Sequence, residues 1–324
     1  MKTLLIRLLV LGLGILLLFL VLRQMNPAAV LQSLSRVGWF GFAVVVIAGL
    51  VLTACLSSGL YPLLSDTASL RLVFAARQVR DSAGDILPFT QLGGIALGMR
   101  VLALGGIAPA RAMAAGVVDV TTELMAQALF ILIGLALAGS AIQADARLGP
   151  YFGWLVTAAV LFCVGVMVFA FLQLVGSRMA EKFLGVHPRP GRGTAAFRDA
   201  LHHLYRQRAR IALSIGLHLL GWCASGLWLW VVFRVLGKPI APASAIAIQS
   251  LLEALRSATV FIPAAVGVQE AGYAALGALF GFAPETGVAV SLLRRGRDIA
   301  VGIPVLLAWQ AAEARRIGGG ADVA

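Results

Sequence analysis

The sequence is poor in charge and in the residues that build metal centres and disulfide frameworks. Charged residues make up 12% of the 324 positions, about half of what a soluble domain carries. The three cysteines, Cys55, Cys163 and Cys223, lie far apart inside apolar stretches, and none of the four histidines has an acidic or cysteine partner at ligand spacing. We therefore expect no disulfide framework, no metal site and no cofactor.

Apolar residues dominate instead, at 60% of the chain with a mean hydropathy of +0.94. The apolar stretches are continuous, which predicts an all-α integral membrane protein, a single polytopic domain over residues 1–324. A basic start without a small-x-small cleavage site indicates an uncleaved first span rather than a signal peptide. Six stretches are long enough to cross a bilayer: 3–22, 39–64, 111–138, 150–175, 211–236 and 286–310.

Two more apolar stretches, 85–107 and 241–282, are interrupted by proline, glycine and charge. Such interruptions free backbone groups, which membranes tolerate only inside protein or beside water. We expect two broken or re-entrant elements here. The segment 176–210 holds eight basic residues against two acids, so the positive-inside rule makes it a basic cytoplasmic loop between spans. Both termini are then also cytoplasmic, and the two broken elements enter from opposite faces.

When the sequence is aligned with itself at an offset of 175 residues, Pro88 aligns with Pro263, Asp119 with Arg294 and Glu123 with Asp298. The agreement of breaks, charges and opposed topology predicts an inverted repeat. In transporters of this kind the substrate site lies between the repeats, near the middle of the membrane.

Several ionisable residues lie where lipid penalises them. Asp119, Glu123 and Gln127 form a stripe on one face of the 111–138 helix, and a charge there costs roughly 2.5–3.5 kcal/mol on insertion scales. Such residues need a partner, a proton or a wet cavity. The expected substrate or coupling residues are Asp119, Glu123, Gln127, Gln269, Glu270, Arg294, Arg297 and Asp298. The expected supporting residues are Arg80, Asp81, Asp85, Pro88, Gly93, Gly94, Arg100, Glu253, Arg256, Pro263 and Gly267.

The partners of these charges are also open to prediction. Helical spacing favours three pairs within single helices, which are Arg77 with Asp81, Glu253 with Arg256, and Arg294 with Asp298. Asp119 and Glu123 have no base within a turn, so we expect Arg294, Arg295 or Arg297 to pair with them. The alternative for Arg77, Arg80 and Arg111 is that they reach the membrane interface. The alternative for Gly94 and Gly98 is close helix contact alone.

Five motifs carry a family resemblance: RDSAGDILP (80–88), QLGG (91–94), VDVTTE (118–123), IP with GVQEAG (262–263 and 267–272), and SLLRRGRD (291–298). Together they resemble the lysylphosphatidylglycerol synthase transmembrane region, a flippase-like superfamily of inner-membrane proteins. The details look most like the hopanoid-biosynthesis-associated HpnL-type proteins. The resemblance implies lipid translocation or export in a bacterial inner membrane, with hopanoid or a related lipid as cargo. Lysine transfer is not expected, because that needs a further soluble domain.

Three functions remain open. A lipid transporter would shelter a headgroup in a polar cavity, with membrane lipids as its partners, and protonation of Asp119, Glu123 or Glu270 would couple the cycle to the proton gradient. A membrane enzyme would use the buried acids as general bases on a lipid headgroup, but no nucleophile set or phosphate-binding loop supports it. An accessory subunit would hold lipid-biosynthesis enzymes through its basic loop. No motif supports nucleic-acid binding, and we expect a transporter rather than an enzyme.

Overall fold

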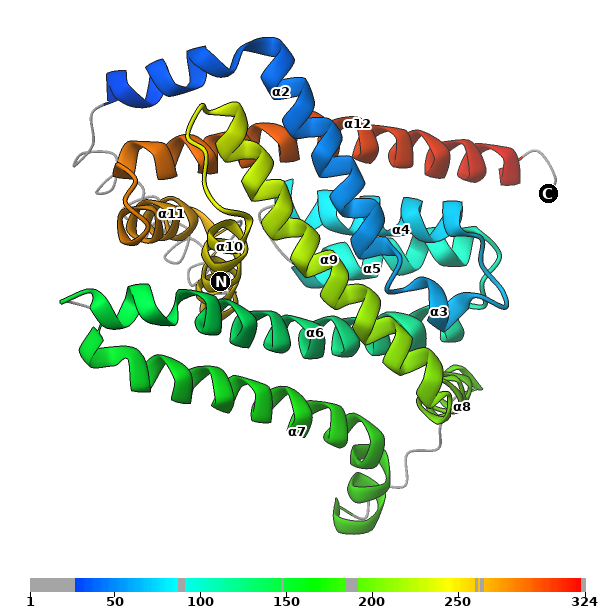
Figure 1. Cartoon of the computed structure of the whole chain (residues 1–324). Coiled ribbons are helices and arrows are strands. Elements are labelled where there is room, and N and C mark those ends of the chain that lie inside the picture. The colour runs from blue at the N-terminus through cyan, green and yellow to red at the C-terminus, as the bar shows by residue number, and fades with distance from the viewer. Residues whose placement is uncertain are drawn as a thin grey trace, which may run out of the picture.

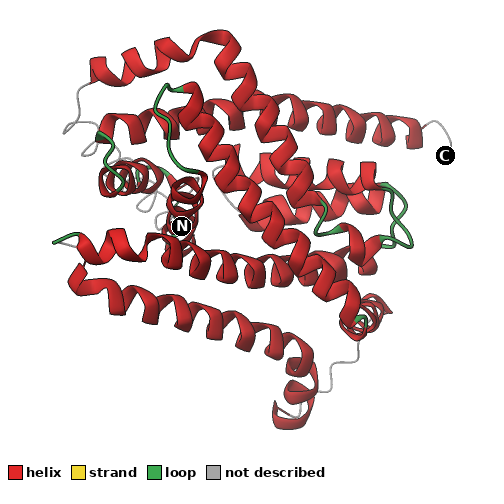
Figure 2. Ribbon diagram, viewed as in Figure 1, coloured by secondary structure: helices red, strands yellow, loops and turns green. Residues whose placement is uncertain are grey.

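The computed structural model describes residues 27–86, 91–146, 149–184, 192–259, 262 and 265–321. Within these ranges the chain is helical, with short connecting turns (Figures 1 and 2). A long apolar chain favours helices in lipid because a helix satisfies its own backbone hydrogen bonds. The predicted all-α class is confirmed for this part of the chain, whereas the predicted first span, 3–22, lies outside it.

Among the described residues, four helical segments are long and apolar enough to cross a membrane. They belong to the helices α2 (Pro27–Ser57), α6 (Pro109–Ala144), α7 (Phe152–Leu184) with the short turn η1 (Gly149–Tyr151) before it, and α9 (Arg208–Val235). These coincide with four of the six predicted spans. The last predicted span, 286–310, lies within the long helix α12 (Pro284–Ala321), which carries four charged residues between positions 294 and 298.

The helix α2 bends at Gly38, whose φ of 58° lies in the left-handed region that favours glycine. The bend is visible in Figure 1 and separates a short N-terminal arm from the long apolar part. After α2 the chain makes a turn, the short helix α3 (Tyr61–Leu64), and a further turn that contains Asp66.

Pairs of short helices occur at both predicted broken elements, although most of the first helix of the first pair precedes the predicted segment 85–107. The first pair is α4 (Leu70–Ile86) and α5 (Gln91–Leu104), and the second is α10 (Pro242–Ala258) and α11 (Val268–Leu279). In the first pair the backbones touch, because a Cβ on Gly94 would lie 2.4 Å from the Arg80 carbonyl oxygen. The close packing of α4 against α5 therefore requires glycine at this position. Both predicted break prolines, Pro88 and Pro263, lie outside the described residues.

The order of helices occurs twice along the chain. A short helix pair is followed by a long helix, first as α4, α5 and α6, and again as α10, α11 and α12. The second helix of each pair ends at Leu104 or Leu279, and the long helix begins at Pro109 or Pro284, so both boundaries are offset by 175 residues. Figure 1 shows α6 and α12 running in opposite directions, and α2 crossing α9 in the same opposed manner.

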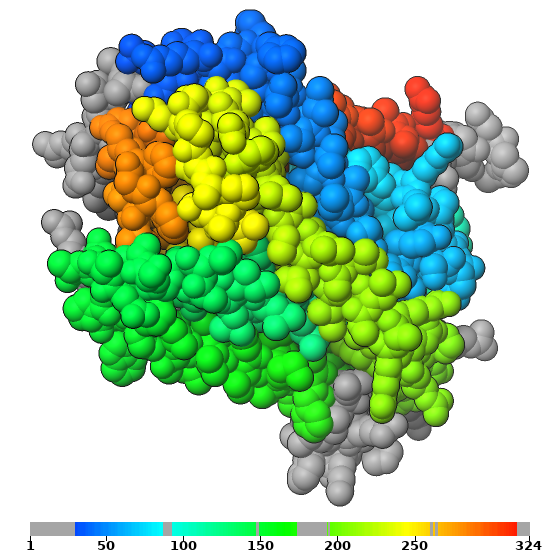
Figure 3. Space-filling view, in the orientation of Figure 1, coloured from blue at the N-terminus to red at the C-terminus, as the bar shows by residue number. Residues whose placement is uncertain are grey.

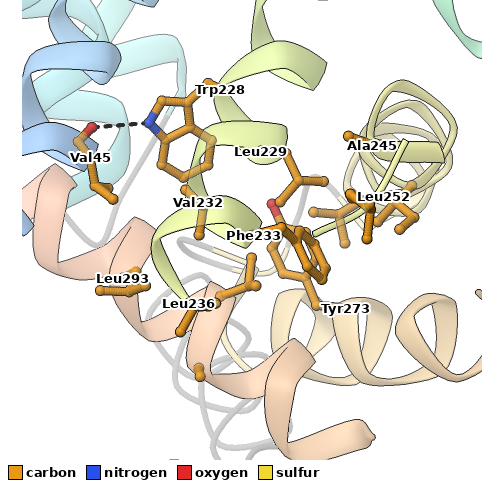
Figure 4. Packing of buried hydrophobic residues seen from close by; sticks show 14 of the residues in the cluster. Val45, Trp228, Leu229, Val232, Phe233, Leu236, Ala245, Leu252, Tyr273 and Leu293 are labelled. Atoms are coloured by element: carbon orange, nitrogen blue, oxygen red, sulfur yellow. Dashed lines mark hydrogen bonds between the residues drawn. The ribbon is translucent and has the colours of Figure 1, made fainter. Parts of the chain in front are cut away.

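The largest buried apolar cluster joins α2, α9, α10, α11 and α12. Figure 4 shows the α9 side chains Trp228 and Phe233 facing residues from these neighbours, and the Trp228 indole N–H donates to the Val45 carbonyl oxygen at 3.1 Å. The indole nitrogen of a buried tryptophan needs such an acceptor. This packing holds α9 against α2, α10, α11 and α12.

The outer surface is strongly apolar, as lipid contact requires. On α7 the side chains of Trp154, Leu161 and Phe171 are all exposed, and this helix covers the lower part of the face in Figure 3, in green, with α6 beside it. The described residues of the predicted basic loop, 176–210, are mostly helical. The segment contains the end of α7 and an amphipathic helix, α8 (Arg192–Arg206), whose apolar side includes the buried Leu204.

Candidate functional site

Two arginines of α4 hold the two carboxylates of α6. Arg77 donates to both oxygens of Glu123, at 2.6 and 3.2 Å. Arg80 donates to Glu123 at 2.6 Å and to Asp119 at 2.7 Å. Residues three or four apart share a helix face, so the arginine pair on α4 meets the acidic pair on α6 directly. Such paired geometry is what allows charge to stay in a low-dielectric interior.

His218 of α9 completes this cluster. Its Nε2 atom lies 3.0 Å from the second oxygen of Asp119, and its ring is fully buried. Gly59 leaves room for the ring, because a Cβ there would lie 2.5 Å from the imidazole. The Nδ1 atom has no partner among the described residues. His218 is therefore a titratable group held against Asp119 with one nitrogen unoccupied.

The partners predicted for Asp119 and Glu123 are wrong. The arginines of α12 bind other acids, and the arginines of α4, expected as an alternative to reach the interface, lie inside instead: Arg77 is only 4% exposed. The error has a physical cause. The helix α4 packs mainly against α5 and α12, and the long side chains of Arg77 and Arg80 reach from it to the carboxylates of α6, so the order of the helices does not determine the ion pairs.

A second charged cluster joins α10, α11 and α12. Arg294 donates to Glu253 at 3.2 Å and to the Tyr273 hydroxyl at 3.3 Å. Glu253 also accepts from Arg256 at 3.4 Å and from Gln249 at 2.9 Å. The predicted pairs of Glu253 with Arg256 and of Arg77 with Asp81, at 2.8 Å, are both present. The predicted pair of Arg294 with Asp298 is replaced, since Asp298 is bonded by the adjacent Arg297.

The Glu270 side chain caps the N-terminus of α11. One of its oxygens accepts from the Gly267 backbone N–H at 2.8 Å, and the other binds Arg295 at 2.7 Å and Ser291 at 2.9 Å. Gln269 donates to the same Ser291 hydroxyl at 2.7 Å. The Gly267 φ of 79° favours glycine at this position. These contacts tie α11 to α12.

A polar cavity of about 190 Å³ lies between the two clusters. Its charged lining comes from both halves of the chain, and its neutral lining includes Thr53 of α2 and Trp222 and Trp228 of α9. The charged lining consists of five arginines (Arg77, Arg80, Arg256, Arg294 and Arg297) and five acids (Asp81, Asp85, Glu123, Glu253 and Asp298). The cavity therefore presents equal numbers of both charges inside a lipid-exposed bundle.

Some predicted site residues lie elsewhere. Asp119 is fully buried behind the cavity wall, and Gln127 is buried further along α6. Arg100 lies at the surface, where it binds Glu313 at 2.7 Å. Gly93 and Gly94 lie at the start of α5 and do not line the cavity.

Other residues of the site carry no clear signal in the sequence. The partner of His218 is 99 residues away, so no spacing on its own helix indicates it. The burial of Arg77 likewise depends on contacts with residues of another helix, so no pattern along α4 indicates it.

The fold and this site define a multi-pass helical membrane protein with a charge-paired cavity at its centre. Residues 4–305 match the family described as the lysylphosphatidylglycerol synthase TM region, and the chain belongs to that family. Comparison with curated proteins and with solved structures finds no match. The family relates the protein to lipid handling in membranes.

Proposed function

We propose that this protein moves a lipid across the inner membrane of a bacterium, as a flippase-like transporter. The observation that carries the proposal is the cavity, in which ten charged side chains from α4, α6, α10 and α12 face one small polar space. Ionisable groups at membrane depth are costly unless they serve a pathway or a binding site. A passing lipid headgroup needs such a space, while its hydrocarbon stays outside.

The size of the cavity supports a headgroup as the bound part. Sites for whole drug-sized ligands span about 300–1,000 Å³, whereas this cavity has about 190 Å³. A fused ring system or a pair of acyl chains therefore stays in the bilayer. For hopanoid or a related lipid, the cargo suggested by the HpnL-type resemblance, only the polar end enters.

The repeated helix order supplies a means of alternating access. We propose that the two units, α4–α6 and α10–α12, are inverted repeats, which agrees with their common offset of 175 residues and with the opposed directions of α6 and α12 (Figure 1). Rocking one unit against the other around a fixed site would open it to each face in turn. With the basic segment 176–210 in the cytoplasm, both termini are cytoplasmic as well.

Transport fits the site better than catalysis. Among the cavity acids, Glu123 is bonded by two arginines, and Glu253 accepts from Arg294, Arg256 and Gln249. A carboxylate held in this way is a weak general base, because taking a proton would break its ion pairs. An accessory role for lipid-biosynthesis enzymes would need no buried charge, so the cavity also counts against it.

Lipid analysis of a deletion strain tests the proposal. Total lipid and separated inner and outer membranes should be compared between the deletion strain, the parent and a complemented strain. We expect one lipid species to be made in normal amount and to accumulate in the inner membrane. Absence of that species with accumulation of its precursor would instead indicate an enzyme or an accessory subunit, and the transport proposal would be abandoned.

A further inference from the structure

The charge of the buried site limits the charge of its ligand. The ten cavity residues sum to zero, with five arginines and five acids. Behind them Glu270 is neutralised by Arg295, and Asp119 adds one negative charge that His218 balances only when it is protonated. The whole buried set is therefore neutral or carries one negative charge, and in neither state is it positive.

A ligand with net negative charge would meet no surplus of positive charge here. Burying a charge without compensation costs several kcal/mol per ion, so a net anionic headgroup is disfavoured in both protonation states of His218. An uncharged headgroup avoids that cost, but its hydroxyl groups offer weaker hydrogen bonds than a charged partner to groups that must be drawn away from an ion pair. A headgroup with one charge of each sign can replace an existing ion pair without changing the net charge.

One ion pair of the cavity is loose enough to be replaced in this way. Asp85 at the end of α4 and Arg256 at the end of α10 are separated by 3.9 Å, beyond hydrogen-bond distance. The second contact of Arg256, to Glu253, is also long at 3.4 Å. Among the described residues, Asp85 makes no side-chain hydrogen bond and no closer ion pair. The nearby pairs of Arg77 and Arg80 are much tighter, at 2.6 to 2.8 Å.

The position of this pair adds to the argument. Asp85 precedes the break of the first helix pair, and Arg256 precedes the break of the second. Both line the cavity. A ligand that separates Asp85 from Arg256 therefore acts on the contact between the two units whose relative movement transport requires.

We propose that the cavity takes a zwitterionic lipid headgroup, with an ammonium group bound by Asp85 and a phosphate group bound by Arg256. This inference rests on the proposed transport function and, in place of an uncharged hopanoid, narrows its cargo to lipids whose polar end carries both charges. Arginine suits the phosphate because its planar fork of donors matches phosphate oxygens.

Transfer in proteoliposomes tests the inference. The purified full chain would be reconstituted with trace lipids that carry a fluorophore on the acyl chain, so that the headgroup stays intact, and dithionite would report the fraction in the outer leaflet. The three labelled lipids are phosphatidylethanolamine, phosphatidylglycerol and an uncharged glycolipid. We expect phosphatidylethanolamine to be transferred fastest. Equal or faster transfer of either other lipid overturns the inference but leaves transport standing. If none of the three is transferred above protein-free vesicles, the proposed function itself fails, and the inference with it.

Two variants make the test specific to charge. Asp85→Asn raises the charge of the site by one, and the ratio of phosphatidylethanolamine to phosphatidylglycerol transfer should fall by about tenfold, because one buried unit charge exceeds the energy that a tenfold change requires. Arg256→Gln lowers the charge by one and should slow both phosphate lipids. Asp66→Asn makes the same chemical change as the first variant in a turn outside the cavity, and its ratio should equal that of the wild type. A ratio in Asp85→Asn equal to that of Asp66→Asn refutes the inference, provided that both variants elute as folded protein.

Discussion

The substitution Arg77→Met tests whether the buried cluster of α4 and α6 is as closely coupled as its geometry indicates. Arg77 is 4% exposed, and its side chain donates two hydrogen bonds to Glu123 and one to Asp81. Methionine keeps the length of the side chain and removes the charge, so Glu123 retains one arginine and Asp81 retains none. Removing one partner of a buried pair costs about 3–5 kcal/mol. For a chain of this size that corresponds to a fall of about 4–7 °C in the unfolding temperature.

Thermal unfolding in a mild detergent, followed by size-exclusion chromatography or intrinsic fluorescence, measures this effect. Arg100→Met is the matched control, because Arg100 makes an equally short ion pair, at 2.7 Å to Glu313, with a side chain that is 54% exposed. Exposed pairs contribute about 0–1 kcal/mol, so this variant should unfold within about 2 °C of the wild type. Adding Glu123→Gln to Arg77→Met should restore part of the loss by removing an uncompensated charge. Equal unfolding temperatures for the two methionine variants would refute the reasoning.

Three further predictions address single contacts. His218→Gln removes the buried imidazole that contacts Asp119 and should lower the unfolding temperature, whereas His203→Gln on the exposed side of α8 should leave it unchanged; equal unfolding temperatures for the two variants would show that the buried contact does not stabilise the bundle. Gly94→Ala should destabilise the first helix pair by about 1–3 kcal/mol, because its Cβ would lie 2.4 Å from a backbone oxygen, whereas Gly153→Ala meets nothing within 4 Å and should be neutral in the same unfolding assay. The hydrogen bond from Arg111 lowers the pKa of Asp66, so the stability that Asp66 contributes is present above its unfolded pKa of about 4 and is lost as the pH falls below it. Unfolding temperatures of wild type and Asp66→Asn should therefore differ at pH 7, and the difference should shrink as the pH falls below about 4; a constant difference would contradict this.

Most of the fold was readable from local pattern. Continuous apolar stretches placed α6, α7 and α9, because hydrocarbon imposes the same length on every span. The two broken elements were readable from proline, glycine and charge, since such residues interrupt a helix wherever it lies. The exception is the segment 176–210, in which the amphipathic helix α8 was taken for loop. Its basic residues dominate the composition, and only its packing against α6 shows where its apolar side goes.

The residues of the candidate site were more predictable than their partners. Glu253 and Arg256 are neighbours on one helix, so spacing alone indicated their contact. Glu123 binds arginines 46 and 43 residues away, and no spacing rule connects residues on different helices. The same limit applies to His218, which belongs to neither helix pair.

The amino-acid sequence by itself determined that this is a helical membrane protein, that two of its elements are broken, and that particular charges remain in the membrane. These properties follow from each residue's own cost in lipid and from spacing along single helices. Only the tertiary structure decided that Arg77 and Arg80 face Glu123, that His218 holds Asp119, and that ten charges enclose one cavity. The reason is that ion pairing between helices depends on the register in which they pack, and that register is set by the whole bundle together, through contacts such as that of Gly94 with the backbone of α4.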